Sequence, residues 1–423
     1  LWGIRCWFLL MRIACQASHV RLRGAGQRGQ RRRHGYAVRG LSGPGLGEQT
    51  PVWVLSSHSP MGGPSMMVHW LDQGEAAMWL AGLAAAPVAC FSSDWVLATT
   101  FDQNGGPCEP ATKEAMHKRP SIVEIIGAPC DLGCNLRGAN VGPSMVRVAG
   151  LTDRLEELSI RAIDGGDIAV PLRERLGRQT PQNRDLYVST IGQICDELFA
   201  RVQVSLRESR FPLILGGDHS IAIGSIKGTA DYCHQHGAQL GLLWVDAHAD
   251  MNTPATSQSG NIHGMPLSTV LGLGFERLVH VGGVGPRLRP ENVALIGIRD
   301  LDREERTFVR ETGIRYYTMK DIDQRGMYAV ITEALDDLNQ RCAALHVSFD
   351  LDAVDPVYAP GVSTPVRGGL TYREAHLLLE VVAERGFLRS MDLVELNPMN
   401  DVGHQTTRLC IELALSALGK AIL

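Results

Sequence analysis

Acidic residues and histidines are concentrated in two short segments of this 423-residue sequence, Asp-Ala-His-Ala-Asp at 246–250 and Ser-Phe-Asp-Leu-Asp at 348–352. Each segment follows an apolar run typical of a buried strand. A further histidine, His219, lies in Gly-Gly-Asp-His-Ser, which follows another apolar run at 211–215. Neither acidic segment contains a lysine or arginine. Carboxylates placed so densely at strand ends repel one another unless cations lie among them.

Six of these side chains have the spacing of metal ligands. Alternate residues of an extended segment point the same way, so donors two residues apart can converge on one point. The four carboxylates and two imidazoles suffice for two ions that share bridging carboxylates, and such a centre activates water for hydrolysis. Oxygen-rich sites with some imidazole favour Mn²⁺, with zinc, cobalt or iron as alternatives. The predicted ligands are His219, Asp246, His248, Asp250, Asp350 and Asp352.

A single Asp-x-His-x-Asp motif is equally consistent with surface charge or a helix cap. Three clusters, each after a strand-like run, favour metal binding instead. Four aspartates without counterions at the ends of buried strands would cost several kcal/mol each.

Strand-like and helix-like runs alternate from residue 121 onward. Strands are predicted at 121–126, 211–215, 240–245, 292–298, 345–349 and 390–396, and helices at 144–158, 190–206, 221–236, 302–312, 319–341, 372–385 and 406–418. This alternation predicts an α/β fold, a three-layer α/β/α sandwich with a central mostly parallel sheet. In such sheets functional groups gather beyond the carboxyl ends of the strands, where every predicted ligand lies.

The first part of the chain differs from the rest. Its first 47 residues contain nine arginines and no acidic residue. We predict that residues 1–118 are a basic, low-complexity leader, either disordered or an over-extended reading frame with Met116 as the true start. Residues 119–423 are predicted to form one catalytic domain. An organelle transit peptide or a nucleic-acid patch are the alternatives for the leader.

Composition predicts a cytoplasmic protein without a membrane or nucleic-acid partner, with organelle targeting by the leader as the alternative. The chain is 44% apolar and 20% charged, as is common in soluble proteins. The uncharged run at 76–91 is shorter than the ~20 residues that a membrane span needs. The ten cysteines contain no C-x-x-C pair, which favours reduced thiols in an intracellular protein.

Three segments carry a family resemblance: Gly-Gly-Asp-His-Ser at 216–220, Asp-Ala-His-Ala-Asp at 246–250, and Ser-Phe-Asp-Leu-Asp-Ala-Val-Asp-Pro at 348–356. In this order they resemble the three signatures of the ureohydrolase family, which includes arginase, agmatinase and formimidoylglutamase. The resemblance covers about residues 121–423. The loops at 251–254 and 259–266 are most similar to those of arginases.

The resemblance implies a binuclear manganese centre. One ion would bind His219, Asp246, Asp250 and Asp350, and the other Asp246, His248, Asp350 and Asp352, with Asp246 and Asp350 bridging. A metal-bridging hydroxide would attack the guanidinium carbon of L-arginine and give L-ornithine and urea.

Other roles also follow from the resemblance. His263 matches the proton-shuttle histidine, and Asp250 would pass a proton to the leaving amine. Glu395 matches the guanidinium-binding glutamate. The α-carboxylate would contact Asn252 and Ser259, the α-amino group would contact Asp302, and Thr364 would line the same pocket. His346 and His376 match no role and are expected to be structural or at the surface.

The resemblance also implies a homo-oligomer, a trimer or a hexamer. Two alternatives stay open for the function. The first is another ureohydrolase, acting on agmatine or guanidinobutyrate, although Asn252, Ser259 and Asp302 favour a substrate with an α-amino acid end. The second is a catalytically silent scaffold on the same fold.

Overall fold

The computed structural model describes residues 35–38, 52–56, 67–71 and 120–421. The chain divides into two compact units, Leu1–Cys108 and Glu109–Leu423. In the first unit, three short strands that were not predicted form an antiparallel sheet in the order β1-β2-β3. They are β1 (Gly35–Val38), β2 (Val52–Ser56) and β3 (Met67–Leu71). The uncharged run at 76–91 lies outside the described residues.

The second unit is built on an eight-stranded sheet in which each strand pairing is parallel. The spatial order is β5-β4-β6-β11-β10-β7-β8-β9. This confirms the α/β prediction, with a wholly parallel rather than mostly parallel sheet. The strands are β4 (Ile122–Ala128), β5 (Arg161–Asp167), β6 (Phe211–Gly216), β7 (Leu240–Val245), β8 (Val293–Ile298), β9 (Arg315–Thr318), β10 (Ala344–Asp350) and β11 (Leu388–Val394).

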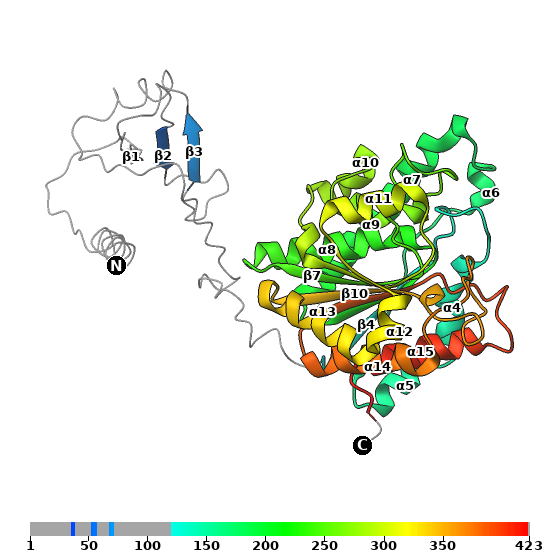
Figure 1. The fold of residues 1–423 in the computed structure, drawn as a ribbon. Helices are drawn as coiled ribbons and strands as arrows, with labels where there is room; N and C mark the ends of the chain where they lie inside the picture. Colours follow the sequence, from blue (N-terminus) through cyan, green and yellow to red (C-terminus); the bar gives the residue numbers. More distant parts are fainter. Residues whose placement is uncertain (1–34, 39–51, 57–66, 72–119, 422–423) are drawn as a thin grey trace, which may run out of the picture. The chain divides into compact units, whose positions relative to one another are not determined.

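Helices cover both faces of this sheet (Figure 1). One face packs against α4 (Gly142–Val148), α5 (Leu151–Glu157), α12 (Met319–Arg325), α13 (Met327–Arg341), α14 (Tyr372–Arg385) and α15 (Gln405–Ala417). The other packs against α7 (Arg184–Arg207), α8 (Ala222–Gln235), α9 (Pro266–Val270), α10 (Glu276–Val279) and α11 (Arg303–Thr312). The short helix α6 (Arg173–Leu176) has no buried residue.

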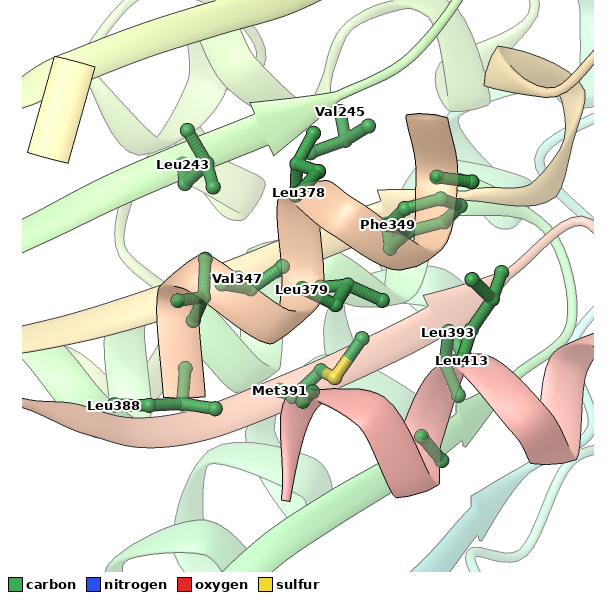
Figure 2. Packing of buried hydrophobic residues seen from close by; sticks show 14 of the residues in the cluster. Leu243, Val245, Val347, Phe349, Leu378, Leu379, Leu388, Met391, Leu393 and Leu413 are labelled. Carbon is green, nitrogen blue, oxygen red and sulfur yellow. The ribbon is translucent and has the colours of Figure 1, made fainter. Parts of the chain in front are cut away.

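Alternate residues of the central strands divide between the two faces. Toward α14 and α15, the strands present an apolar surface that includes Val347, Phe349, Met391 and Leu393 (Figure 2). The opposite side of the same two strands is polar, with His346 and Ser348 on β10 and Ser390 and Asp392 on β11, all 0% exposed. The central strands therefore combine one apolar and one polar side, both buried.

The structure differs from the predicted elements in several ways, among them the short helices α6, α9 and α10, which were not predicted. The helix predicted at 319–341 is two helices, since Gly326 has a φ of 78° between them. The helix predicted at 144–158 is interrupted in the same way at Gly150, with a φ of 91°. The edge strands β5 and β9 were not predicted, because their exposed polar residues hide the apolar pattern of a buried strand.

None of the helices in the described part of the chain combines the length and the apolar character that crossing a bilayer requires.

Candidate metal centre and active site

The six predicted ligands meet at the carboxyl edge of the sheet, beyond β6, β10 and β7. His219 begins the short 3₁₀ helix η3 (His219–Ile221) after β6. Residues 246–250 follow β7 directly. Asp350 is the last residue of β10, and Asp352 lies in the next 3₁₀ helix, η7 (Leu351–Ala353). Parallel strands end at the same edge, which is why segments 130 residues apart in sequence converge.

The first half of the cluster surrounds the ring of His219. Its Nδ1 atom lies 3.3 Å from Asp246 Oδ2, 3.1 Å from Asp250 Oδ2 and 3.2 Å from Asp350 Oδ2. The ring is 1% exposed, and within the described part of the chain Nδ1 has no hydrogen-bond partner. One imidazole nitrogen and three carboxylates thus face the same small space.

The second half is arranged around His248. Its Nδ1 atom lies 3.4 Å from Asp246 Oδ1 and 3.2 Å from Asp352 Oδ2. In the described residues, the two sets that have the spacing of a metal site are His219, Asp246 and Asp350, and Asp246, His248 and Asp352. Asp246 belongs to both, with one oxygen toward each histidine, as a bridging carboxylate requires.

The buried carboxylates of the cluster repel one another. Burial and the neighbouring charges of Asp352 and Asp246 raise the pKa of Asp350. Burial and the charge of Asp246 raise the pKa of Asp250 to about 6. Burial would lower the pKa of the His219 imidazole, but the three carboxylates hold it well above its usual range. The donor set therefore fits hard divalent cations, which relieve the repulsion and accept both oxygen and imidazole ligands.

Further side chains orient these ligands. Trp244 donates from Nε1 to Asp246 Oδ2 at 2.9 Å and stacks on the His219 ring at 4.1 Å and 10°. Thr364 donates to Asp352 Oδ2 at 3.0 Å, so it contacts a ligand rather than lining only the substrate pocket. Neither contact was predicted. Trp244 is the only tryptophan beyond residue 95, and it precedes Asp246 by two residues, a signal that was available in the sequence.

Glu395 and His263 form a buried pair beside the cluster. His263 Nδ1 lies 3.0 Å from Glu395 Oε1, which also accepts a hydrogen bond from the backbone N–H of His219 at 2.9 Å. Glu395 is 1% exposed, and its Oε2 has no hydrogen-bond partner among the residues that the structure describes. Burial would raise the pKa of Glu395, but His263 and the His219 N–H keep it below its usual value. A buried, ionised oxygen without a donor is the atom that a cationic ligand would satisfy.

The contact with Glu395 also shifts the pKa of His263. Burial lowers the pKa of an imidazole, yet the hydrogen bond and charge of Glu395 raise the pKa of His263 to about 9. The backbone N–H of His263 is held by Gly133 O at 3.1 Å. With Nδ1 directed at Glu395 and 17% of the side chain exposed, the ring contacts both the buried acid and solvent.

The residues expected at the α-amino acid end are only partly brought together. Asn252 Nδ2 donates to Asp302 Oδ2 at 2.8 Å, so these two side chains meet. Asp302 also caps α11, because its Oδ1 accepts from the N–H of Glu305 at 2.8 Å. Ser259 lies elsewhere: its Oγ accepts from the N–H of Asn261 at 3.2 Å, and no contact joins it to Asn252 or Asp302.

Ser259 lines a surface cavity of about 850 Å³ that is rich in arginine. Arg184, Arg178 and Arg173 face it, and Arg184 and Arg178 form no ion pair within the described residues. The guanidinium of Arg184 packs over Gly260, whose missing side chain and φ of 72° leave the space for it. The cavity thus offers positive charge beside one of the predicted substrate-binding residues.

Two further aspartates within the signatures, Asp218 and Asp355, brace loops. Asp218 accepts hydrogen bonds from the N–H groups of Gly133 and Ser220, and Asp355 accepts from those of Val357 and Gly368. Glu305 was not predicted. It is buried beneath the 246–252 loop, accepts from Met251 N–H at 3.0 Å, and has its pKa raised by burial to about 8.

A parallel α/β sheet with a carboxylate–imidazole cluster beyond its central strands, and a buried glutamate beside it, defines the class of amidinohydrolase enzymes. Residues 121–419 match the arginase family, and the chain belongs to it. This confirms the family that the three sequence signatures indicated.

Several relatives resemble the chain over nearly their whole length. An arginase of Bacillus caldovelox is 45% identical over 301 residues, which are 71% of this chain and 99% of that protein. The crystal structure of arginase from Bacillus subtilis superimposes with a TM-score of 0.65 at 44% identity, covering 72% of this chain and all of that one. An Entamoeba histolytica arginase in complex with L-ornithine has a TM-score of 0.64 at 28% identity, with coverage of 72% and 100%.

Proposed function

We propose that this chain hydrolyses L-arginine to L-ornithine and urea at a binuclear manganese centre. The observation that supports this most directly is the pair of converging donor sets that share Asp246, next to a buried glutamate oxygen without a partner. The relatives named arginase agree with it. Two divalent ions, when bound, supply a water nucleophile at neutral pH by lowering the pKa of water.

The guanidinium would be oriented by Glu395. Its free Oε2 is buried and ionised, and a carboxylate accepts charge-assisted hydrogen bonds from a planar guanidinium. The backbone N–H of His219 fixes Oε1, so the carboxylate is anchored to a residue of the metal cluster. This arrangement would hold the guanidinium carbon beside the ligands.

Two groups are suited to move protons. Asp250, a buried carboxylate of the cluster, can accept a proton from water and release it to a leaving amine. His263 contacts the buried glutamate through Nδ1 and reaches solvent, so it can exchange protons between the site and water.

The far end of the substrate would be held by polar residues. The linked pair of Asn252 and Asp302 offers an amide and a carboxylate, the latter suited to an α-amino group. The cavity at Ser259 is lined by four arginines and one glutamate, and its excess positive charge would attract a carboxylate that reached it. Agmatine carries an ammonium group and no carboxylate, so this charge pattern favours L-arginine.

The test is urea release by the full-length chain from L-arginine and from agmatine, after EDTA treatment and after Mn²⁺ is restored, with elemental analysis of the protein. We expect Mn²⁺-dependent activity with L-arginine as the better substrate. Faster agmatine hydrolysis would favour a different ureohydrolase, and no urea from any guanidine compound would favour a silent scaffold. A cytoplasmic homo-oligomer stays a prediction from the resemblance.

A further inference from the structure

A row of polar side chains runs through the core between α8 and the two central strands. The parallel register sets Ser348 opposite Asp392 and His346 opposite Ser390. We call the row the buried polar ladder. Its members, each 0% exposed, are Ser225 and Thr229 on α8, His346 and Ser348 on β10, and Ser390 and Asp392 on β11.

Hydrogen bonds join this ladder to the metal centre. Ser348 Oγ donates to Asp392 Oδ1 at 2.5 Å and lies 2.9 Å from His219 Nε2. Asp392 Oδ2 accepts from Ser225 Oγ at 2.6 Å and lies 2.9 Å from His346 Nε2. Asp392 is thus held on two sides and acts on His219 through a single hydroxyl group.

The direction of the bonds follows from the charge of Asp392. Burial would raise its pKa, but the charge and hydrogen bond of His346 keep it below the usual value, so the carboxylate only accepts. Ser348 has one proton and gives it to Asp392, so its oxygen must accept from His219. Nε2 of His219 therefore carries the ring proton.

The proton on Nε2 determines what the other ring nitrogen of His219, Nδ1, can do. With Nε2 protonated, Nδ1 is the nitrogen that faces Asp246, Asp250 and Asp350, at 3.1–3.3 Å. A bare lone pair facing three carboxylates is repulsive, so this space takes either a proton on Nδ1 or a divalent cation that replaces it. Stacking on Trp244 fixes the plane of the ring, while the bond to Ser348 fixes its rotation.

We propose that Asp392 is a positioning residue of the metal centre, which acts through Ser348 to hold His219 in the tautomer and orientation that a divalent ion requires. A buried histidine–carboxylate pair costs more than apolar residues of equal size unless its polar groups are all satisfied. On the other side of β11, Met391 and Leu393 pack against apolar side chains. The inference depends on the proposed function in one respect, namely that the cluster binds a metal ion.

Asp392→Asn tests the proposal with almost no change in volume. The amide can donate to Ser348, whose proton would then turn to His219 Nε2 and leave the ring proton on Nδ1, where the metal must bind. We expect Mn²⁺ affinity, measured by calorimetry on the EDTA-treated full-length chain, to fall ~10–100-fold. Millimolar Mn²⁺ should restore kcat, with KM for L-arginine unchanged.

Asp231→Asn is the matched control. Asp231 is also on α8 and 4% exposed, and it accepts from three side chains, those of Gln203, Gln235 and Arg287. None of these contacts joins it to the ladder. This variant should bind Mn²⁺ as the unaltered chain does, even if its unfolding midpoint falls as much as that of Asp392→Asn.

Ser348→Ala provides a second test, because it removes the hydroxyl and leaves Asp392 in place. We expect a fall in Mn²⁺ affinity in the same direction. Folded variants that bind Mn²⁺ within about threefold of the unaltered chain would overturn the proposal and leave the proposed function intact. If both variants fail to fold without metal, the ladder serves folding rather than the positioning of His219, and the proposal is overturned. An unaltered chain that binds no Mn²⁺ would overturn both proposals.

Discussion

Glu395 combines features that rarely occur together at the scale of a single residue. It is 1% exposed, has a φ of 63°, and keeps one carboxylate oxygen without a donor. A positive φ in a non-glycine residue costs of order 1–3 kcal/mol and persists where the surrounding structure enforces it. Asp250, with a φ of 51°, shares this strain. Strain at two residues of the proposed site fits a site whose geometry is set for chemistry.

Glu395→Gln should weaken substrate binding and catalysis but not metal binding. The amide replaces one acceptor by a donor that opposes the guanidinium N–H groups, and a charge-assisted hydrogen bond contributes about 1.5–3 kcal/mol. We expect kcat/KM for L-arginine to fall by at least about 10–100-fold, measured by urea release, with Mn²⁺ affinity unchanged. A variant with normal kinetics would remove Glu395 from the substrate site.

His263→Ala should slow turnover while leaving the metal in place. The ring is not among the ligands, and its predicted task is proton exchange, which contributes ~10²–10⁴-fold to rate. Steady-state urea release and elemental analysis test both points. Near-normal rates would exclude a proton-transfer role for His263.

The pair of His263 and Glu395 should also make stability depend on pH. The folded-state pKa of His263 is about 9, above the unfolded value of about 6.5. A raised histidine pKa stabilises the fold fully below pH ~6.5, and this contribution is lost as the pH rises through 9.

Urea denaturation of EDTA-treated protein measures this contribution. The unaltered chain and His263→Asn should differ in unfolding free energy by a few kcal/mol at pH 6, because each pKa unit corresponds to about 1.4 kcal/mol. This difference should vanish near pH 10. A difference that does not change with pH would contradict the ion pair.

At the scale of elements, the start of helix α11 joins a stability role to a predicted substrate contact. The N-cap residue of α11, Asp302, also bonds to Asn252 at the predicted α-amino acid end. We infer that this one side chain both closes a helix terminus and contributes to the proposed substrate site.

Asp302→Ala should cost ~1 kcal/mol of stability through the lost cap and raise KM for L-arginine severalfold. Thr371→Ala is the matched control, because Thr371 caps α14 in the same way through the N–H of Glu374. It should lose similar stability with KM unchanged. Equal KM values for the two variants would show that Asp302 does not contact the substrate.

At the scale of the whole molecule, the family match begins at residue 121, after the arginine-rich segment. The described contacts of the metal centre and of the ladder lie within residues 120–421. We therefore infer that residues 119–423 form the catalytic domain. Deletion of residues 1–115 should preserve Mn²⁺-dependent urea release and the unfolding midpoint of the remaining chain. Loss of folding or activity would show that the leader is an integral part of the enzyme.

The sequence by itself determined which side chains are candidate ligands and the edge of the sheet at which they lie. Both are local properties, most clearly at β6 and β7, where a buried parallel strand is a continuous apolar run that ends at the first polar residues. The signatures at 216–220, 246–250 and 348–356 also sufficed to indicate the family.

Only the tertiary structure decided which of these residues touch. Ser348 meets Asp392 because β10 and β11 are neighbours in a particular register, and His263 meets Glu395 across 132 positions of sequence. The order of the strands, the breaks at Gly150 and Gly326 and the exposed edge strands depend on packing across the whole sheet. Contacts between distant segments are set by that packing, and local patterns of residues do not contain it.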